Sequence, residues 1–71
     1  MTIDEAAKKL WSMYQDPRYG KATSVPLFGI RFSAELNGMP LKEIAAAAGI
    51  PKSYHAEIRK GINLARFVAE K

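Results

Sequence analysis

The 71-residue sequence predicts an all-α protein, a small bundle of four to five short helices forming one domain over residues 1–71. Two observations support this fold class. Apolar residues recur at steps of three and four in successive segments, which is the period of an amphipathic helix. Glycine and proline fall between these segments, where helices begin and end. The chain contains no cysteine, so neither a disulfide nor a zinc–thiolate site can stabilise its single modest core.

The charge is positive and unevenly distributed along the chain. The net charge is +4 and the isoelectric point is about 9.6. Residues 1–16 hold two lysines against three acidic residues, residues 17–38 three cations against one, and residues 39–71 six cations against three. The segments therefore carry −1, +2 and +3. A positive excess in the C-terminal half favours a polyanionic partner such as DNA.

The first helix is predicted to begin after Thr2, because Thr2 and Glu5 have the spacing of a capping box. Pro17 ends it, since the residue before a proline is disfavoured in the α region. Trp11 and Met13 are expected to broaden its buried face. The apolar stripe itself consists of Ile3, Ala6, Ala7, Leu10 and Tyr14.

Residues 16–25 are predicted to form a loop, in which Arg18, Tyr19 and Lys21 are either solvated or in contact with a phosphate backbone. A second helix is expected to be capped by Ser24 and to cover residues 26–36. Apolar residues recur there at steps of three and four, at Val25, Phe28, Phe32 and Leu36. Gly29 inside it could let another helix approach closely.

Residues 40–60 predict two short helices joined by a tight turn. The first covers residues 40–48 and ends at Gly49, where a left-handed conformation carries no Cβ penalty. Pro51 suits the first turn of the second helix, which runs to about Lys60. Gly61 predicts a break, and Asn63 would cap a last helix over residues 64–70, with Ile62 packed on Phe67.

Residues 41–58 resemble the helix-turn-helix of bacterial repressors such as the lac-repressor and lambda-repressor families. The matching residues are Ile44, Ala45, Ala48, Gly49, Ile50 and Ile58. The resemblance implies that the second helix of the pair enters the major groove of double-stranded DNA. The implied function is DNA binding, sequence-specific or general, by a small transcriptional regulator or by the DNA-targeting domain of a larger system.

The resemblance implies a DNA-facing side made of Pro51, Lys52, Ser53, Ala56, Glu57 and Lys60. Lys52 and Ser53 could reach base edges or phosphates, whereas Lys60, Arg59 and Arg66 would meet the backbone. The predicted DNA-binding residues are eight: Lys42, Lys52, Ser53, Ala56, Glu57, Arg59, Lys60 and Arg66.

Two positions depart from the repressor pattern. The families have an aliphatic residue where His55 stands. Either His55 is tucked against the preceding helix, or the second helix is rotated so that Tyr54 takes the core position. Glu57 would repel phosphate, unless it accepts from a cytosine amino group or pairs with a lysine.

The sequence does not indicate an enzyme. His55 is the only histidine, carboxylates are scattered, and neither a metal-ligand spacing nor a glycine-rich phosphate loop is present, so no cofactor, metal or small-molecule substrate is expected. No apolar run reaches membrane-spanning length, and a cytoplasmic location is expected.

The alternative function is a protein-interaction module, either a homodimer or an adaptor. The apolar residues available for it are Trp11, Met13, Met39, Leu64, Phe67 and Val68.

Overall fold

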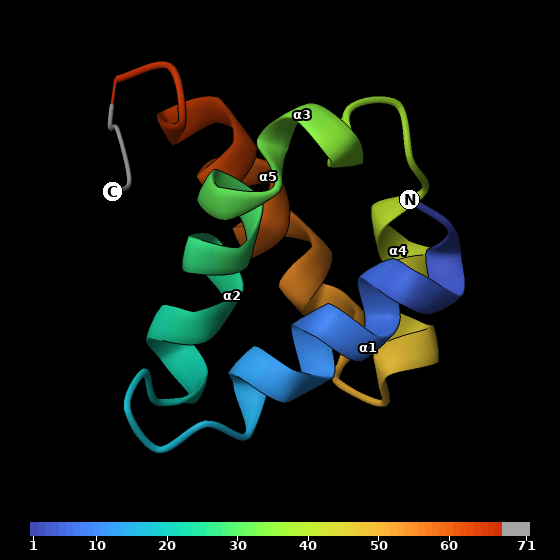
Figure 1. The fold of residues 1–71 in the computed structure, drawn as a ribbon, viewed down its shortest axis with the longest axis vertical. Coiled ribbons are helices and arrows are strands. Elements are labelled where there is room, and N and C mark those ends of the chain that lie inside the picture. Colours follow the sequence, from blue (N-terminus) through green and yellow to red (C-terminus); the bar gives the residue numbers. More distant parts are fainter. Residues whose placement is uncertain (68–71) are drawn as a thin grey trace.

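The computed structural model describes residues 1–67, and within them all regular structure is helical. The α-helices are α1 (Ile3–Tyr14), α2 (Lys21–Arg31), α3 (Ser33–Leu36), α4 (Leu41–Ala48) and α5 (His55–Leu64), and a 3₁₀ turn, η1 (Lys52–Tyr54), precedes α5. In Figure 1, α2 and α5 lie side by side, α1 runs beside α4, and α3 lies at one end. The predicted fold class, an all-α bundle of short helices, is confirmed.

The N-terminus of α1 forms as the sequence predicts. The Glu5 amide donates to Thr2 Oγ1 at 3.1 Å, and the Thr2 amide donates to Glu5 Oε1 at 2.9 Å. This capping box satisfies two backbone donors that the first turn would otherwise leave without partners. Met13 is buried as expected, but Trp11 is 44% exposed, so its predicted place in the core was wrong. The ring of Tyr14 stacks on that of Trp11, with the ring centroids 6.1 Å apart.

The second helix begins earlier than the sequence predicted. Helix α2 starts at Lys21, after Gly20 with φ 76°, so the expected loop over residues 16–25 is shorter. Ser24 is not a cap. Its buried hydroxyl donates to the Lys21 carbonyl at 3.0 Å within the helix. Pro26 lies inside α2, because packing of the flanking residues into the core outweighs its preference for a helix start.

The same helix also ends earlier than expected. Phe32 leaves the helical conformation with φ −112° and ψ 26°, and the short α3 follows it. The change of direction at Phe32 brings Leu36 into the core, where it is 1% exposed, while Phe32 itself is half-buried. A straight helix over residues 26–36 was therefore a wrong prediction.

Gly61 does not break the fourth predicted helix, because α5 continues through it to Leu64. A Cβ placed on Gly61 would lie 3.0 Å from Gly29 Cα, so the two glycines allow α2 and α5 to pack closely. Asn63 lies within α5 and caps no new helix. Phe67 is 83% exposed, which excludes its predicted contact with Ile62. Residues 65–67 form a turn, and the rest of the last predicted helix lies outside the described residues.

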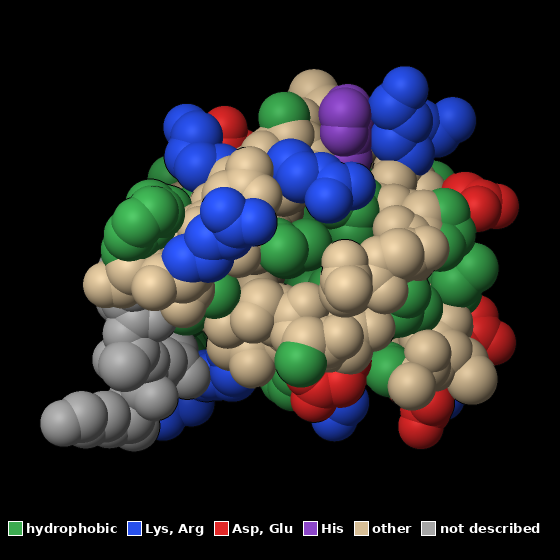
Figure 2. Space-filling view, turned by 90° about the horizontal axis from the view of Figure 1, so that it is seen from above, with side chains coloured by type: hydrophobic (Ala, Val, Ile, Leu, Met, Phe, Trp, Pro, Cys, Tyr) green, Lys and Arg blue, Asp and Glu red, His purple; other side chains and the backbone are tan. Residues whose placement is uncertain are grey.

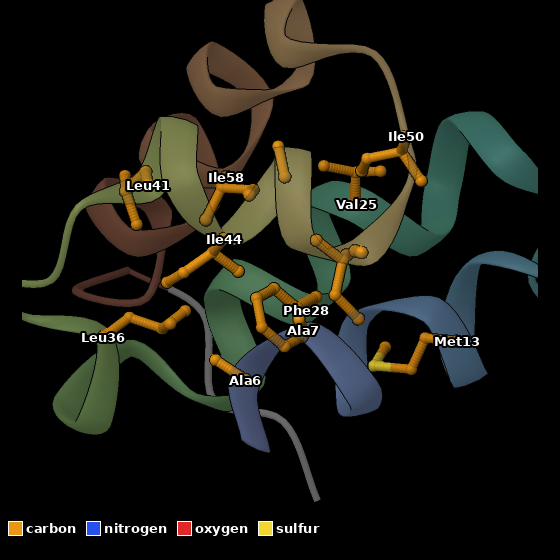
Figure 3. Packing of buried hydrophobic residues seen from close by; sticks show 13 residues of the cluster. Ala6, Ala7, Met13, Val25, Phe28, Leu36, Leu41, Ile44, Ile50 and Ile58 are labelled. Atoms are coloured by element: carbon orange, nitrogen blue, oxygen red, sulfur yellow. The ribbon is translucent and has the colours of Figure 1, made fainter. Parts of the chain in front are cut away.

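The core is one cluster to which α1, α2, α4 and α5 all contribute. Figure 3 shows Phe28 at its centre beside Ala7, with Ile44 and Ile58 directed toward it. These side chains are 5% exposed or less. The alanines of α1 keep that helix close to the aromatic ring, so a domain of this size can still bury a large side chain.

Candidate nucleic-acid interface

The turn between α4 and α5 has the geometry that the sequence predicted. Gly49 has φ 81°, in the left-handed region. Its amide donates to the Ala46 carbonyl at 3.1 Å, and the Ile50 amide donates to the Ala45 carbonyl at 3.2 Å. This pair of bonds is the Schellman motif, which closes a helix and reverses the chain. Ile50 is buried, so it anchors the turn between the two helices.

Helix α5 has one face in the core and one in solvent. Ile58 and Gly61 are buried against the rest of the bundle. The residues on the opposite side, spaced by three and four, are exposed. They begin in η1 and comprise Lys52, Ser53, Ala56, Arg59, Lys60 and Asn63. Asn63 was not among the predicted interface residues, although its spacing from Ala56 and Lys60 could have identified it.

An open hollow separates the start of α4 from α5, with a volume of about 410 Å³. Lys42 and Glu43 line it from α4, and His55 and Arg59 line it from α5. Met39, Pro40 and Leu41 complete its wall. Two cationic side chains and the histidine therefore share one concave surface, which the sequence did not predict because its two sides come from different helices.

The two alternatives for His55 and Tyr54 each hold in part. His55 is half-buried beside the start of α4, as the first alternative requires. Tyr54 also packs against the core, with its ring edge toward Tyr14 and the centroids 5.8 Å apart. Hydrogen bonding with the Tyr14 hydroxyl raises the pKa of Tyr54. The start of α5 is thus held from two sides.

Glu57 is the one predicted interface residue that is half-buried rather than exposed. Its Oε1 lies 3.7 Å from Lys60 Nζ, one helical turn away. Pairing with a lysine was one of the alternatives for Glu57. At this distance and exposure the pair contributes little to stability, so Lys60 is free to turn toward another anion.

The cations near residues 16–21 contact neighbouring groups of the protein. Arg18 forms a bidentate pair with Asp16, with Nη2 2.7 Å from Oδ2, and this contact holds the pKa of the Asp16 carboxyl below its usual range. The guanidinium of Arg18 lies 5.5 Å from the Tyr19 ring, and Lys21 Nζ lies 5.7 Å from the Tyr14 ring. The Arg18 side chain nevertheless remains 77% exposed, so the ion pair with Asp16 partly neutralises its charge without removing it from solvent.

Figure 2 shows Lys and Arg side chains gathered around the histidine on one face, with acidic side chains mainly at its edges. Of the eight predicted interface residues, all but Glu57 are exposed, and the structure brings Lys42 and Arg59 to the same hollow. Arg66 follows α5 in the terminal turn. The arrangement can offer several positive charges to an extended polyanion.

Comparisons with known proteins bear on the whole chain. A protein-family model described as HTH-like domain matches residues 2–71. No curated protein and no solved structure matches the chain. Within residues 1–67, no helix is long and apolar enough to cross a membrane. The same part of the chain contains no cluster of three or more His, Cys, Asp or Glu side chains that could hold a metal ion.

Proposed function

The chain belongs to the HTH-like domain family, and from this premise we propose that it binds double-stranded DNA through α5 and the start of α4. Its role would be that of a small transcriptional regulator or of the DNA-targeting domain of a larger system. The proposal includes no catalytic activity and no cofactor. A cytoplasmic location is part of the proposal.

The observation that carries the proposal is the division of α5 into two faces. Ile58 is fully buried, whereas Arg59 and Lys60 of α5 are exposed, as is Lys52 of the preceding turn η1. A helix anchored along one face and cationic along the other can lie in a groove between two rows of phosphates. The resemblance to the lac-repressor and lambda-repressor families supports the same orientation.

The hollow beside α5 adds a second set of contacts. Lys42 and Arg59 would neutralise backbone phosphates, and His55 could donate from a ring nitrogen to the same strand. Such contacts fix the register of a protein on the duplex without selecting a sequence. Base edges would be reached by Ser53, Ala56 and Glu57, which lie toward the start of α5.

The experiment that tests the proposal is an amide NMR titration of the protein with a short random duplex at several salt concentrations. We expect shifts concentrated on η1, the exposed side of α5 and the start of α4, and an affinity that falls steeply as salt rises. Shifts confined to residues 16–21 would move the interface to Arg18, Tyr19 and Lys21. Absence of salt-dependent binding would reject DNA binding.

The second candidate function is a protein-interaction module without a nucleic-acid role. The observation in its favour is the exposure of large apolar side chains, since Trp11, Leu64 and Phe67 are 44%, 40% and 83% exposed. Met13, which was expected to contribute, is buried, Met39 packs against the core, and Val68 lies outside the described residues. An apolar contact would persist at high salt, in contrast to DNA binding.

A further inference from the structure

A lysine of α2 lies beside the start of α5, although the two are far apart in the sequence. Lys21 is exposed, and its Nζ lies 5.7 Å from the centroid of the Tyr14 ring. That ring meets the Tyr54 ring edge-on, with the centroids 5.8 Å apart. Tyr54 is the last residue of η1, which also contains Lys52. One aromatic ring therefore separates Lys21 from the turn at which the candidate DNA surface begins.

The charge of Lys21 acts on the same tyrosine. Hydrogen bonding with Tyr14 is the largest cause that raises the pKa of Tyr54, and the positive charge of Lys21 acts in the opposite direction. Electrostatic effects between exposed groups are screened beyond about 8–10 Å in physiological salt. The Lys21 ammonium group and the Tyr54 side chain therefore share one part of the surface.

Lys21 differs in this respect from the arginine of its segment. Arg18 pairs with Asp16, and its guanidinium lies over the Tyr19 ring, 5.5 Å from the centroid. Lys21 lies instead over the ring that contacts η1, and among residues 1–67 no carboxylate forms an ion pair with it. Its charge is therefore available to an anion that approaches α5.

The start of α5 is flanked on another side by the hollow between α4 and α5. Tyr54 and His55 are consecutive residues, and consecutive side chains of a helix point in different directions. Tyr54 packs on Tyr14 of α1, whereas His55 lines the hollow together with Lys42 of α4. The first residues of α5 therefore have Lys21 on one flank and Lys42 on another, and the two lysines come from different helices.

Cations on two flanks of one helix suit the major groove, which is about 12 Å wide and has a sugar–phosphate backbone on either side. We propose that Lys21 binds a phosphate of the DNA strand opposite the one contacted by Lys42 and Arg59. The start of α5 is then held between two backbones. This inference rests on the proposed function, because it adds a contact to the same interface. Lys21 lies outside residues 41–58, so the helix pair itself does not supply this contact.

Salt titrations of binding to a short random duplex test the contact at Lys21. Lys21→Ala should lower the affinity and flatten its log–log dependence on salt by about 0.9, whereas Lys21→Arg keeps the charge and should retain the wild-type slope. The matched control is Lys9→Ala, because Lys9 Nζ also lies over an aromatic ring, that of Phe32, which packs on Phe28 and not on η1. Circular dichroism should show the same helicity in all three variants.

Cross-linking tests the assignment to opposite strands. The chain contains no cysteine, so Lys21→Cys and Lys42→Cys, alone and combined, each accept a photoreactive maleimide at one known position. The two strands of the duplex carry different dyes, and irradiation is performed at low salt, where binding is tightest. The double variant should yield a product in which one protein chain is joined to both strands on a denaturing gel. Each single variant should yield products that contain one strand only.

Two outcomes would overturn this inference alone. One is a doubly cross-linked product that contains a single strand, and the other is a wild-type salt slope in Lys21→Ala. In either case a flattened slope in Lys42→Ala would still support DNA binding through α5 and the start of α4. Absence of salt-dependent binding by the wild-type chain would instead reject the proposed function, and the contact at Lys21 with it.

Discussion

Gly29 of α2 and Gly61 of α5 face each other where these two helices pack, and a Cβ on Gly61 would lie 3.0 Å from Gly29 Cα. A Cβ added to Gly29 would lie 3.0 Å from the Ile62 amide nitrogen. Both obstacles are backbone atoms, which cannot rotate away as a flexible side chain can. The position of α5, and with it the orientation of the candidate DNA surface, depends on this contact.

Gly61→Ala should therefore destabilise the protein by about 1–3 kcal/mol through overpacking. The sign of the change in unfolding free energy is informative, because a glycine-to-alanine change at an exposed helix position would stabilise the helix by about 1 kcal/mol. Chemical denaturation measures the free energy of unfolding. Asn63→Ala, at an exposed position of the same helix, serves as the control and should have little effect. An increase in stability on Gly61→Ala would contradict the close contact.

Gly49→Val should destabilise the fold by at least about 1 kcal/mol, because a β-branched residue resists positive φ. No atom lies within 4 Å of a Cβ built on Gly49, so the cost is conformational and not steric crowding. Gly49→Asn should be tolerated better, since asparagine adopts the left-handed conformation more readily. Equal thermal midpoints for wild type, Gly49→Val and Gly49→Asn would exclude a left-handed turn.

Phe28→Ala should cost roughly 3–5 kcal/mol, enough to unfold much of so small a domain. Phe28 is fully buried, whereas Phe32 is half-buried. The centroid of the Phe32 ring lies 5.4 Å from that of Phe28 and 5.5 Å from Lys9 Nζ. Phe32→Ala should accordingly cost less, on the order of 1–3 kcal/mol. The two variants are compared by urea denaturation. A reversed order of stability would place Phe32 at the centre of the core instead.

The capping box predicts a dependence of stability on acid pH. Hydrogen bonds from Thr2, the backbone amide first, lower the pKa of the Glu5 carboxyl. A carboxyl whose pKa is lower in the folded state stabilises the fold above its ordinary pKa. That stabilisation is lost as the pH falls through the lowered value. The difference in stability between wild type and Glu5→Gln should therefore be largest near neutrality and shrink by about pH 3. A difference that is constant over this range would rule out the carboxylate contact.

Lys52→Ala combined with Lys60→Ala should weaken binding to duplex DNA while leaving the thermal midpoint unchanged. Each lost phosphate contact should flatten the log–log dependence of affinity on salt by about 0.9. The control is Lys9→Ala, which removes an exposed charge from α1, away from α5. Affinity and slope equal to wild type in the double variant would show that α5 is not the reading helix.

The sequence by itself determined the features that depend on local chemistry. The capping box at Thr2 and Glu5 is confirmed, because its hydrogen bonds join residues three apart. The turn at Gly49 is confirmed for the same reason, since positive φ is a property of one residue. The family match to an HTH-like domain agrees with the helix pair that this turn creates.

The tertiary structure alone decided the features that depend on contacts between distant segments. Pro26 lies inside a helix and Gly61 does not end one, because packing between α2 and α5 outweighs the local preferences of both residues. Trp11 was assigned to the core by its neighbours in α1, yet it forms the wall of a groove that exists only once α4 is in place. The hollow shared by His55 and Arg59 with Lys42 likewise requires two helices, whose relative position no short segment of the chain can specify.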